Sequence, residues 1–62
     1  MHLKVTALAR KVGAIGVFER QQFSVVLPDS VSRDEITMGV IREIRNQGYE
    51  IEALVRVMPE DA

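Results

Sequence analysis

The chain has 62 residues, of which 47% are hydrophobic, and nine acidic against eight basic residues give a net charge of −1. This length predicts one domain with a small aliphatic core, a kind of domain that often gains stability by oligomerising. The absence of cysteine excludes disulfides and thiolate chemistry, and the slightly acidic balance disfavours the basic footprint that phosphate binding requires.

Two alternating segments come first along the chain. Apolar side chains occupy every second position of residues 3–9 and again of residues 23–27, with mostly polar residues between them. A period of two is the signature of a β-strand. The first half of the chain therefore predicts two strands.

The segment that joins these strands is an apolar run broken by Gly13 and Gly16. We interpret it as a hairpin connection, because glycine tolerates the positive φ of tight turns. A bulge near Glu19 and Arg20 would turn both Phe18 and Phe23 towards the core. If the apolar tip instead stays exposed, it is a candidate docking element.

Pro28 ends the second strand, and a helix start follows. Ser32 and Glu35 have the spacing of a capping box, in which each side chain bonds to the backbone amide of the other residue. Gly48 suits the left-handed position that follows a helix. The pattern predicts a helix over residues 33–47.

The predicted helix has one apolar and one polar side. The apolar sector faces the sheet and consists of Ile36, Thr37, Val40, Ile41 and Ile44. Gly39 interrupts the helix interior, and we interpret it as a point of close packing against the sheet. Met38, Arg42 and Arg45 project from the outer side and form a second candidate protein-binding surface.

Residues 49–58 alternate once more and predict a third strand. Pro59 removes the next backbone donor, so we expect a single domain over residues 1–58 and a flexible tail over 59–62. The fold class is then α+β, with the order β-β-α-β. The connection through the helix is expected to be right-handed. Because short open sheets with one solvated face are commonly antiparallel, we predict a mainly antiparallel sheet of spatial order 2-1-3, with 1-2-3 as the alternative.

Catalytic and metal-binding patterns are missing from the sequence. The one histidine, His2, lies near the terminus, and no carboxylate pairs with it at metal-ligand spacing. No familiar glycine-rich phosphate loop is present. We therefore expect a protein that is not an enzyme and has no cofactor or metal. No apolar run has membrane-spanning length, and residues 1–4 lack a signal-peptide block, so we predict a cytoplasmic protein without membrane contact.

The main functional indication is an excess of apolar residues on the sheet. Strand parity assigns the helix-covered side to Val5, Ala7, Val25, Leu27, Ile51, Val55 and Val57, and it leaves four apolar residues on the open side: Leu8, Val26, Leu54 and Met58. An apolar patch with a charged rim is typical of a protein interface. The alternative is that these four side chains are simply tolerated on a solvated face.

The sequence thus predicts a small protein-interaction module, an adaptor or inhibitor that acts by binding a partner protein and forms a homodimer. Small inhibitors and adaptors encoded by bacteria or phages fit this size. The alternative is a nucleic-acid-binding protein whose basic hairpin contacts phosphates through Arg10, Lys11 and Arg20.

Overall fold

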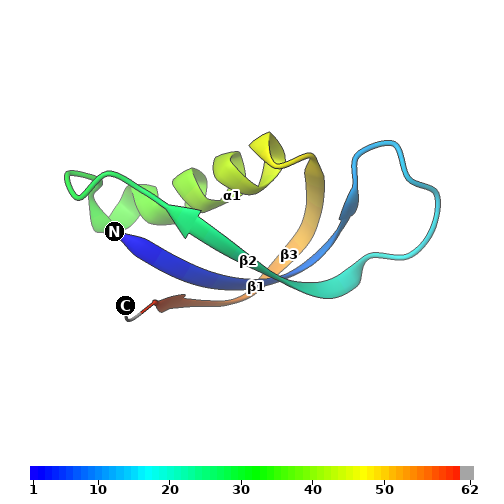
Figure 1. Cartoon of the computed structure of the whole chain (residues 1–62), viewed down its shortest axis with the longest axis horizontal. Coiled ribbons are helices and arrows are strands. Elements are labelled where there is room, and N and C mark those ends of the chain that lie inside the picture. The colour runs from blue at the N-terminus through cyan, green and yellow to red at the C-terminus, as the bar shows by residue number, and fades with distance from the viewer. Residues whose placement is uncertain (61–62) are drawn as a thin grey trace.

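The computed structural model describes residues 1–60. Within them, strands β1 (His2–Lys11), β2 (Glu19–Val26) and β3 (Tyr49–Pro59) form an antiparallel sheet in the order β2-β1-β3. Helix α1 (Ile36–Asn46), entered through a 3-10 turn over Arg33–Glu35, lies on one face of this sheet (Figure 1). The α+β fold class and the 2-1-3 order are confirmed.

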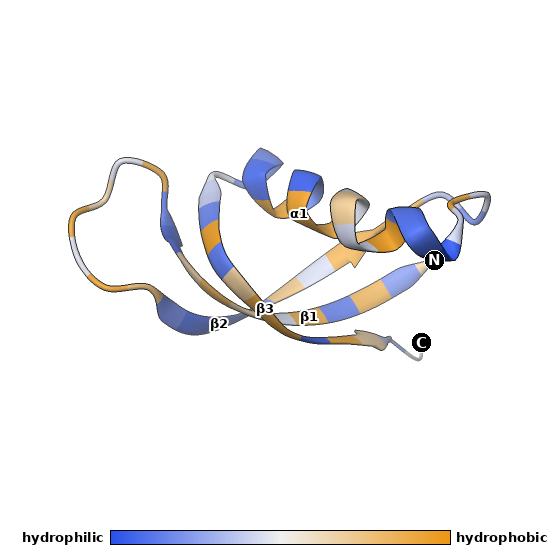
Figure 2. Ribbon diagram, turned by 180° about the vertical axis from the view of Figure 1, so that it is seen from behind, coloured by the Kyte–Doolittle hydropathy of each residue, from blue (hydrophilic) through white to orange (hydrophobic). Residues whose placement is uncertain are grey.

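A small aliphatic core fills the space between helix and sheet. Its members come from every second position of β1 and β2, from the residue after β2 and from the inner side of α1: Leu3, Val5, Ala7, Ala9, Phe23, Val25, Leu27, Val40 and Ile44. Figure 2 shows the corresponding alternation of hydrophobic and hydrophilic positions along β1 and β2. Tyr49 closes one end of the core with its ring edge against Phe23, at a centroid distance of 5.0 Å.

The start of the helix differs from the expected capping box. The Ser32 hydroxyl donates to the Glu35 carboxylate at 2.9 Å, and neither side chain caps a backbone amide. The Glu35 amide donates to the Ser32 carbonyl instead, at 3.0 Å. A 3-10 turn satisfies the Glu35 amide through the backbone, so this amide is not free to donate to the Ser32 hydroxyl.

The geometry confirms the left-handed position of Gly48 and the close packing of Gly39, but the neighbour of Gly39 is not part of the sheet as we expected. Gly48 has φ +93° just after the helix, in the left-handed region. Gly39 packs closely, because a Cβ built there would lie 3.1 Å from the Leu27 Cδ2 atom. Leu27 follows β2 in the chain, so the close approach is to the β2–α1 link.

Strand β3 departs from simple alternation and changes which residues face the helix. Its register against β1 shifts twice, so that Val55 and Glu52 are each an extra residue without a partner. Leu54 consequently pairs with Ala7, whose side chain is in the core, and Leu54 itself packs against that core. Our placement of Leu54 on the open face and of Val55 on the helix side was therefore wrong.

Strand pairing also extends slightly beyond the expected domain end. Pro59 pairs with Leu3, and the Glu60 amide donates to the His2 carbonyl at 2.9 Å. The sheet thus continues past Met58, where we expected the tail to begin. Residues 61 and 62 of that tail lie outside the described residues.

Candidate interaction surfaces

The β1–β2 connection projects from one end of the sheet, away from the helix and the termini (Figure 1). Three of its side chains are strongly exposed: Val12 by 64%, Ile15 by 102% and Val17 by 77%. We call residues 12–18 the tip loop. Single exposed apolar side chains are common on protein surfaces. Three of them in one short loop form an exposed apolar patch, which is a feature of interaction sites.

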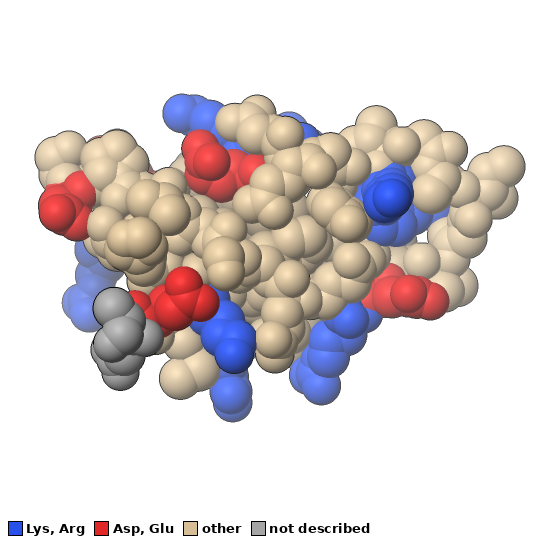
Figure 3. All heavy atoms as spheres, in the orientation of Figure 1, with Lys and Arg blue, Asp and Glu red and all other residues tan. Residues whose placement is uncertain are grey.

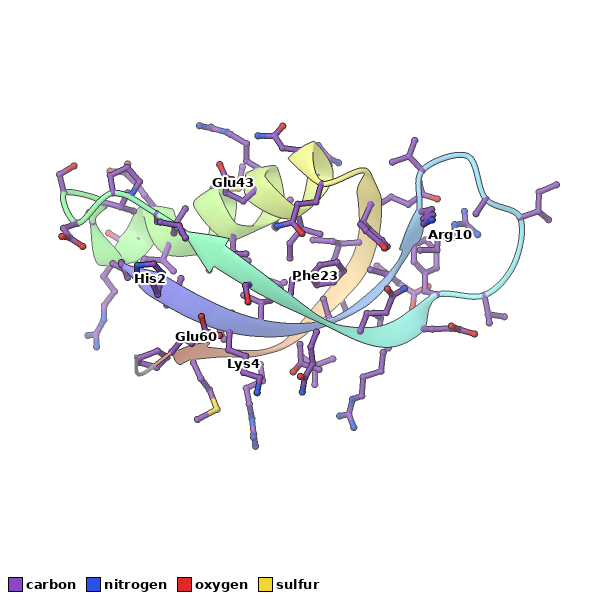
Figure 4. The ribbon with its side chains drawn as sticks, in the orientation of Figure 1. His2, Lys4, Arg10, Phe23, Glu43 and Glu60 are labelled. Carbon is purple, nitrogen blue, oxygen red and sulfur yellow. The ribbon has the colours of Figure 1, made fainter. Side chains whose placement is uncertain are left out.

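Arg10 holds the far side of the tip loop in place. Its guanidinium donates to the Gly16 carbonyl at 2.6 Å and lies 4.2 Å from the centroid of the Phe18 ring. The same group forms an ion pair with Glu50, its neighbour on β3. One side chain of β1 therefore joins the end of the loop that leads into β2 to the third strand, and Figure 4 shows Arg10 at the base of the loop.

Backbone bonds fix the near side of the loop. The Ala14 amide donates to the Lys11 carbonyl at 3.0 Å, and the Val12 amide donates to the Gly48 carbonyl at 2.9 Å. These bonds and the Arg10 contacts hold the loop by its polar groups. Its apolar side chains are left outside the core.

The bulge that we expected near Glu19 is absent from the β1–β2 register, which runs without a shift from the His2–Val26 pair to the Ala9–Glu19 pair. Phe18 precedes β2, and its ring packs against the guanidinium of Arg10, which has the open-face parity of β1. The expectation that Phe18 would face the core beside Phe23 was therefore wrong.

The open face of the sheet retains three of its four predicted apolar anchors. Leu8, Val26 and Met58 pair with Arg20, His2 and Lys4 respectively, all at open-face positions, and Leu8 is half-buried. Leu54 has moved to the helix side, and the exposed Val55 lies beside Thr6 and Arg56 on the open face. Sequence reasoning missed Val55 because the apolar run Ala53-Leu54-Val55 fits either parity.

Cations accompany these apolar residues on the open face. Figure 3 shows Lys and Arg side chains projecting from the side of the sheet opposite the helix, and Figure 4 identifies Lys4 among them. Arg20 and Arg56 flank a shallow hollow of about 330 Å³ that Thr6, Gln22 and Val55 also line. In residues 1–60 the ion pairs join Met1 to Asp29 and Arg10 to Glu50, which leaves both of these arginines without a carboxylate partner there.

The outer face of α1 carries the second predicted surface. Met38 is 62% exposed and shares a shallow groove of about 300 Å³ with Arg42 and Arg45. These three residues are therefore neighbours, as the helical spacing predicted. Their groove has one exposed apolar anchor, against three in the tip loop.

The predicted phosphate-contacting residues do not form one cluster. Arg10 is engaged by Glu50, Gly16 and Phe18, whereas Arg20 pairs with Leu8 on the open face. Lys11 pairs with Tyr49 and has the opposite strand parity to both arginines. The hairpin base therefore offers dispersed basic groups.

The N-terminus is paired with a carboxylate. The N-terminal ammonium donates to Asp29 Oδ1 at 2.7 Å, which lowers the pKa of that exposed carboxyl below its ordinary value. Across residues 1–60, no group of three or more potential metal ligands gathers, and no helix has the length and apolarity needed to cross a membrane.

Comparison with protein-family models, with curated proteins and with solved structures finds no match for this chain.

Proposed function

We propose that this chain is a non-enzymatic protein-interaction module, an adaptor or an inhibitor, whose principal anchor is the tip loop. The observation that carries the proposal is the exposure of Val12, Ile15 and Val17 in a loop that polar contacts hold at its base. Removing apolar side chains from water is the main favourable term in most protein associations. A loop that is already held in place also loses less conformational entropy on binding.

The shape of the loop indicates the partner surface. A projection with aliphatic side chains at its tip fits an apolar cleft better than a flat surface, because a cleft removes more of its area from water. The partner is therefore a protein with a hydrophobic groove. Lys11 and Arg20 flank the loop and would meet the rim of that groove.

The test is capture of partners from a native lysate by the immobilised chain. The double variant Ile15→Asp with Val17→Asp should lose the captured protein, because it places two charges where apolar contact is needed. Met38→Asp is the matched control, since it adds a charge at a comparably exposed position on the helix. If the double loop variant still captures the partner and Met38→Asp does not, the binding site is on the helix. If the purified chain turns over a substrate, the protein is an enzyme and the proposed class is wrong.

Homodimerisation is the second part of the proposal. Contact between the open faces of two copies would bring their Lys4, Arg20 and Arg56 side chains close together. Repulsion between these positive charges disfavours this arrangement. The edge of β2 is the better site, because its pairing with β1 is regular, whereas the edge of β3 carries two bulges and ends in Pro59. Antiparallel pairing of two β2 edges would give a C2 dimer with one continuous sheet.

Sedimentation should then give twice the 7.0 kDa chain mass at micromolar concentration. Gln22→Pro removes a backbone donor at the middle of this edge and should produce the monomer. Ser24→Thr is the control, since it keeps every backbone donor on the strand. A wild-type chain that sediments as a monomer at all accessible concentrations would rule out the dimer and leave the tip loop unaffected.

Nucleic-acid binding through Arg10, Lys11 and Arg20 has less support. The guanidinium of Arg10 is already engaged, and the three residues are dispersed over two faces. A gel shift at low salt with DNA and RNA tests this alternative, because phosphate contacts would make binding strongly dependent on salt.

A further inference from the structure

The hollow on the open face is built from residues at fixed positions in the sheet. Gln22, Thr6 and Arg56 are direct cross-strand partners and form one row over the three strands. Arg20 stands one step along β2, opposite Leu8. The two arginines come from the outer strands, which are about 10 Å apart on either side of β1. Two long side chains can converge over the middle of such a hollow.

The Val55 bulge shapes this site. In a regular strand Val55 and Arg56 would point to opposite faces, but the extra residue allows both to line the hollow. Val55 supplies an apolar floor and Arg56 a cation at its edge. The irregularity therefore directs a particular pair of side chains towards the solvent.

The charges around the hollow are of one sign. Arg20 and Arg56 have no carboxylate partner in residues 1–60. Lys4, two residues before Thr6 on β1, lies on the same face of the sheet. Glu60 lies at the end of the sheet that is remote from the tip loop, where its amide donates to the His2 carbonyl (Figure 4). Thr6 and Gln22 add hydroxyl and amide donors. Two guanidiniums with uncharged donors between them are suited to an oxyanion.

We propose that this hollow binds a carboxylate side chain from an extended acidic segment of a partner protein. The inference rests on the proposed function as a protein-interaction module and specifies a second contact for it. Arg20 and Arg56 hold the carboxylate, Thr6 donates to it, and apolar neighbours of the acidic residue pack against Val55. The exposed Val26 and Met58 continue the apolar surface along the face.

Two other occupants fit less well. A second copy of this chain would bring the same cations to the face. A single-stranded nucleic acid would be expected to stack its bases on aromatic rings. Phe23 and Tyr49 lie on the helix side of the sheet, and the guanidinium of Arg10 already occupies a face of the Phe18 ring.

The test is a titration of the full chain with a short peptide of alternating glutamate and valine. Binding is followed by the changes in the backbone amide chemical shifts of the chain. We expect the shifts to concentrate at Thr6, Gln22, Val55 and Arg56. Arg20→Gln and Arg56→Gln should each weaken binding about tenfold, the effect of losing one hydrogen bond to a charged group. Arg33→Gln in the 3-10 turn is the matched control, since Arg33 is exposed and lies away from the hollow, and it should leave the affinity unchanged. Well-dispersed spectra of the variants verify that each one is folded.

Three results would overturn the site. The first is equal binding of a peptide in which glutamine replaces every glutamate, because that removes the role of charge. The second is an absence of shifts at millimolar peptide, or shifts confined to other surfaces. The third is tighter binding of a thymidine oligonucleotide than of the acidic peptide, which would assign the hollow to phosphate.

The outcome is separable from that of the proposed function. If the peptide fails to bind while capture through the tip loop persists, the carboxylate site is wrong and the interaction module stands. If the peptide binds while capture no longer depends on Ile15 and Val17, the hollow stands and the tip loop is not the anchor.

Discussion

The core and the tip loop contain the same kinds of aliphatic residue but differ in their burial from solvent. Val40 and Ile44 are fully buried between helix and sheet, whereas Val12, Ile15 and Val17 are exposed at the far end of the hairpin. Aliphatic composition therefore does not decide burial in this chain. Strand and helix periodicity places the first set on facing surfaces, and the second set has no facing element in residues 1–60.

The difference lies in what holds each region. Side-chain packing holds the core together. In residues 1–60, no buried side-chain nitrogen or oxygen atom lacks a hydrogen-bond partner. The tip loop is held by polar contacts at its base, made by Arg10 with Gly16, Phe18 and Glu50. A region held in this way can keep its apolar side chains available for another molecule.

The largest expected effect separates the two regions directly. Ile44→Ala should lower the free energy of unfolding by about 2–5 kcal/mol, because it removes buried methyl groups and leaves a cavity. Ile15→Ala should change it by less than about 0.5 kcal/mol, as is usual for exposed positions. Denaturant unfolding of both variants measures this contrast. Similar losses would mean that Ile15 packs against the domain.

Loss of the Arg10 contacts should have an intermediate effect. Arg10→Ala removes a cation–π contact and two hydrogen bonds, and it should cost about 1 kcal/mol because the group is partly exposed. The amides of residues 12–18 should also become mobile on the nanosecond timescale, which NMR relaxation detects. Arg20→Ala serves as the control. A loop that stays ordered in Arg10→Ala would refute the role of this side chain.

The helix start should contribute less than a capping box would. Ser32→Ala should cost under about 0.5 kcal/mol, because the Ser32 hydroxyl contacts an exposed carboxylate and caps no amide. A working N-cap would cost about 1 kcal/mol on the same substitution. Thermal unfolding distinguishes the two values, and the larger one would show that the cap forms in solution.

The smallest effect concerns acid stability. The pKa of Asp29 lies below its ordinary value of 3.8, because the N-terminal ammonium bonds to its carboxylate and attracts it. This contribution to stability is complete above pH 3.8 and is lost as the pH falls through the lower folded-state pKa. Asp29→Asn should remove this part of the pH dependence, and acetylation of the N-terminus should do the same. The measurement is the free energy of unfolding as a function of pH. If the Asp29→Asn variant and the acetylated chain both kept the wild-type pH profile, the ion pair between the N-terminus and Asp29 would not contribute to stability.

Much of the fold could be predicted because periodicity and turn chemistry agree. The alternation in β1 and β2 identified the core positions of both strands, and Gly48 marked the end of the helix. The 2-1-3 order followed from the preference of small open sheets for antiparallel neighbours. These features depend on local sequence and on general topological rules.

The errors have a common physical origin in β3. Ala53, Leu54 and Val55 are three consecutive apolar residues, so a shift of one position leaves an apolar side chain on either face. The sequence therefore could not reveal that a bulge sends Leu54 to the core and Val55 to the open face. The Arg10 contacts were missed for a related reason, because they join Gly16, Phe18 and Glu50, and only the folded hairpin brings these residues together.

Site-specific cross-linking tests most directly whether the tip loop binds a partner. A photo-reactive phenylalanine analogue is placed in turn at Ile15, at Met38 and at Val26, three exposed positions on different surfaces. After irradiation in the native lysate, the analogue at position 15 should give one dominant adduct with a partner protein, and the analogue at position 38 should give none. Adducts from positions 38 or 26 without one from position 15 would contradict the central role of the loop.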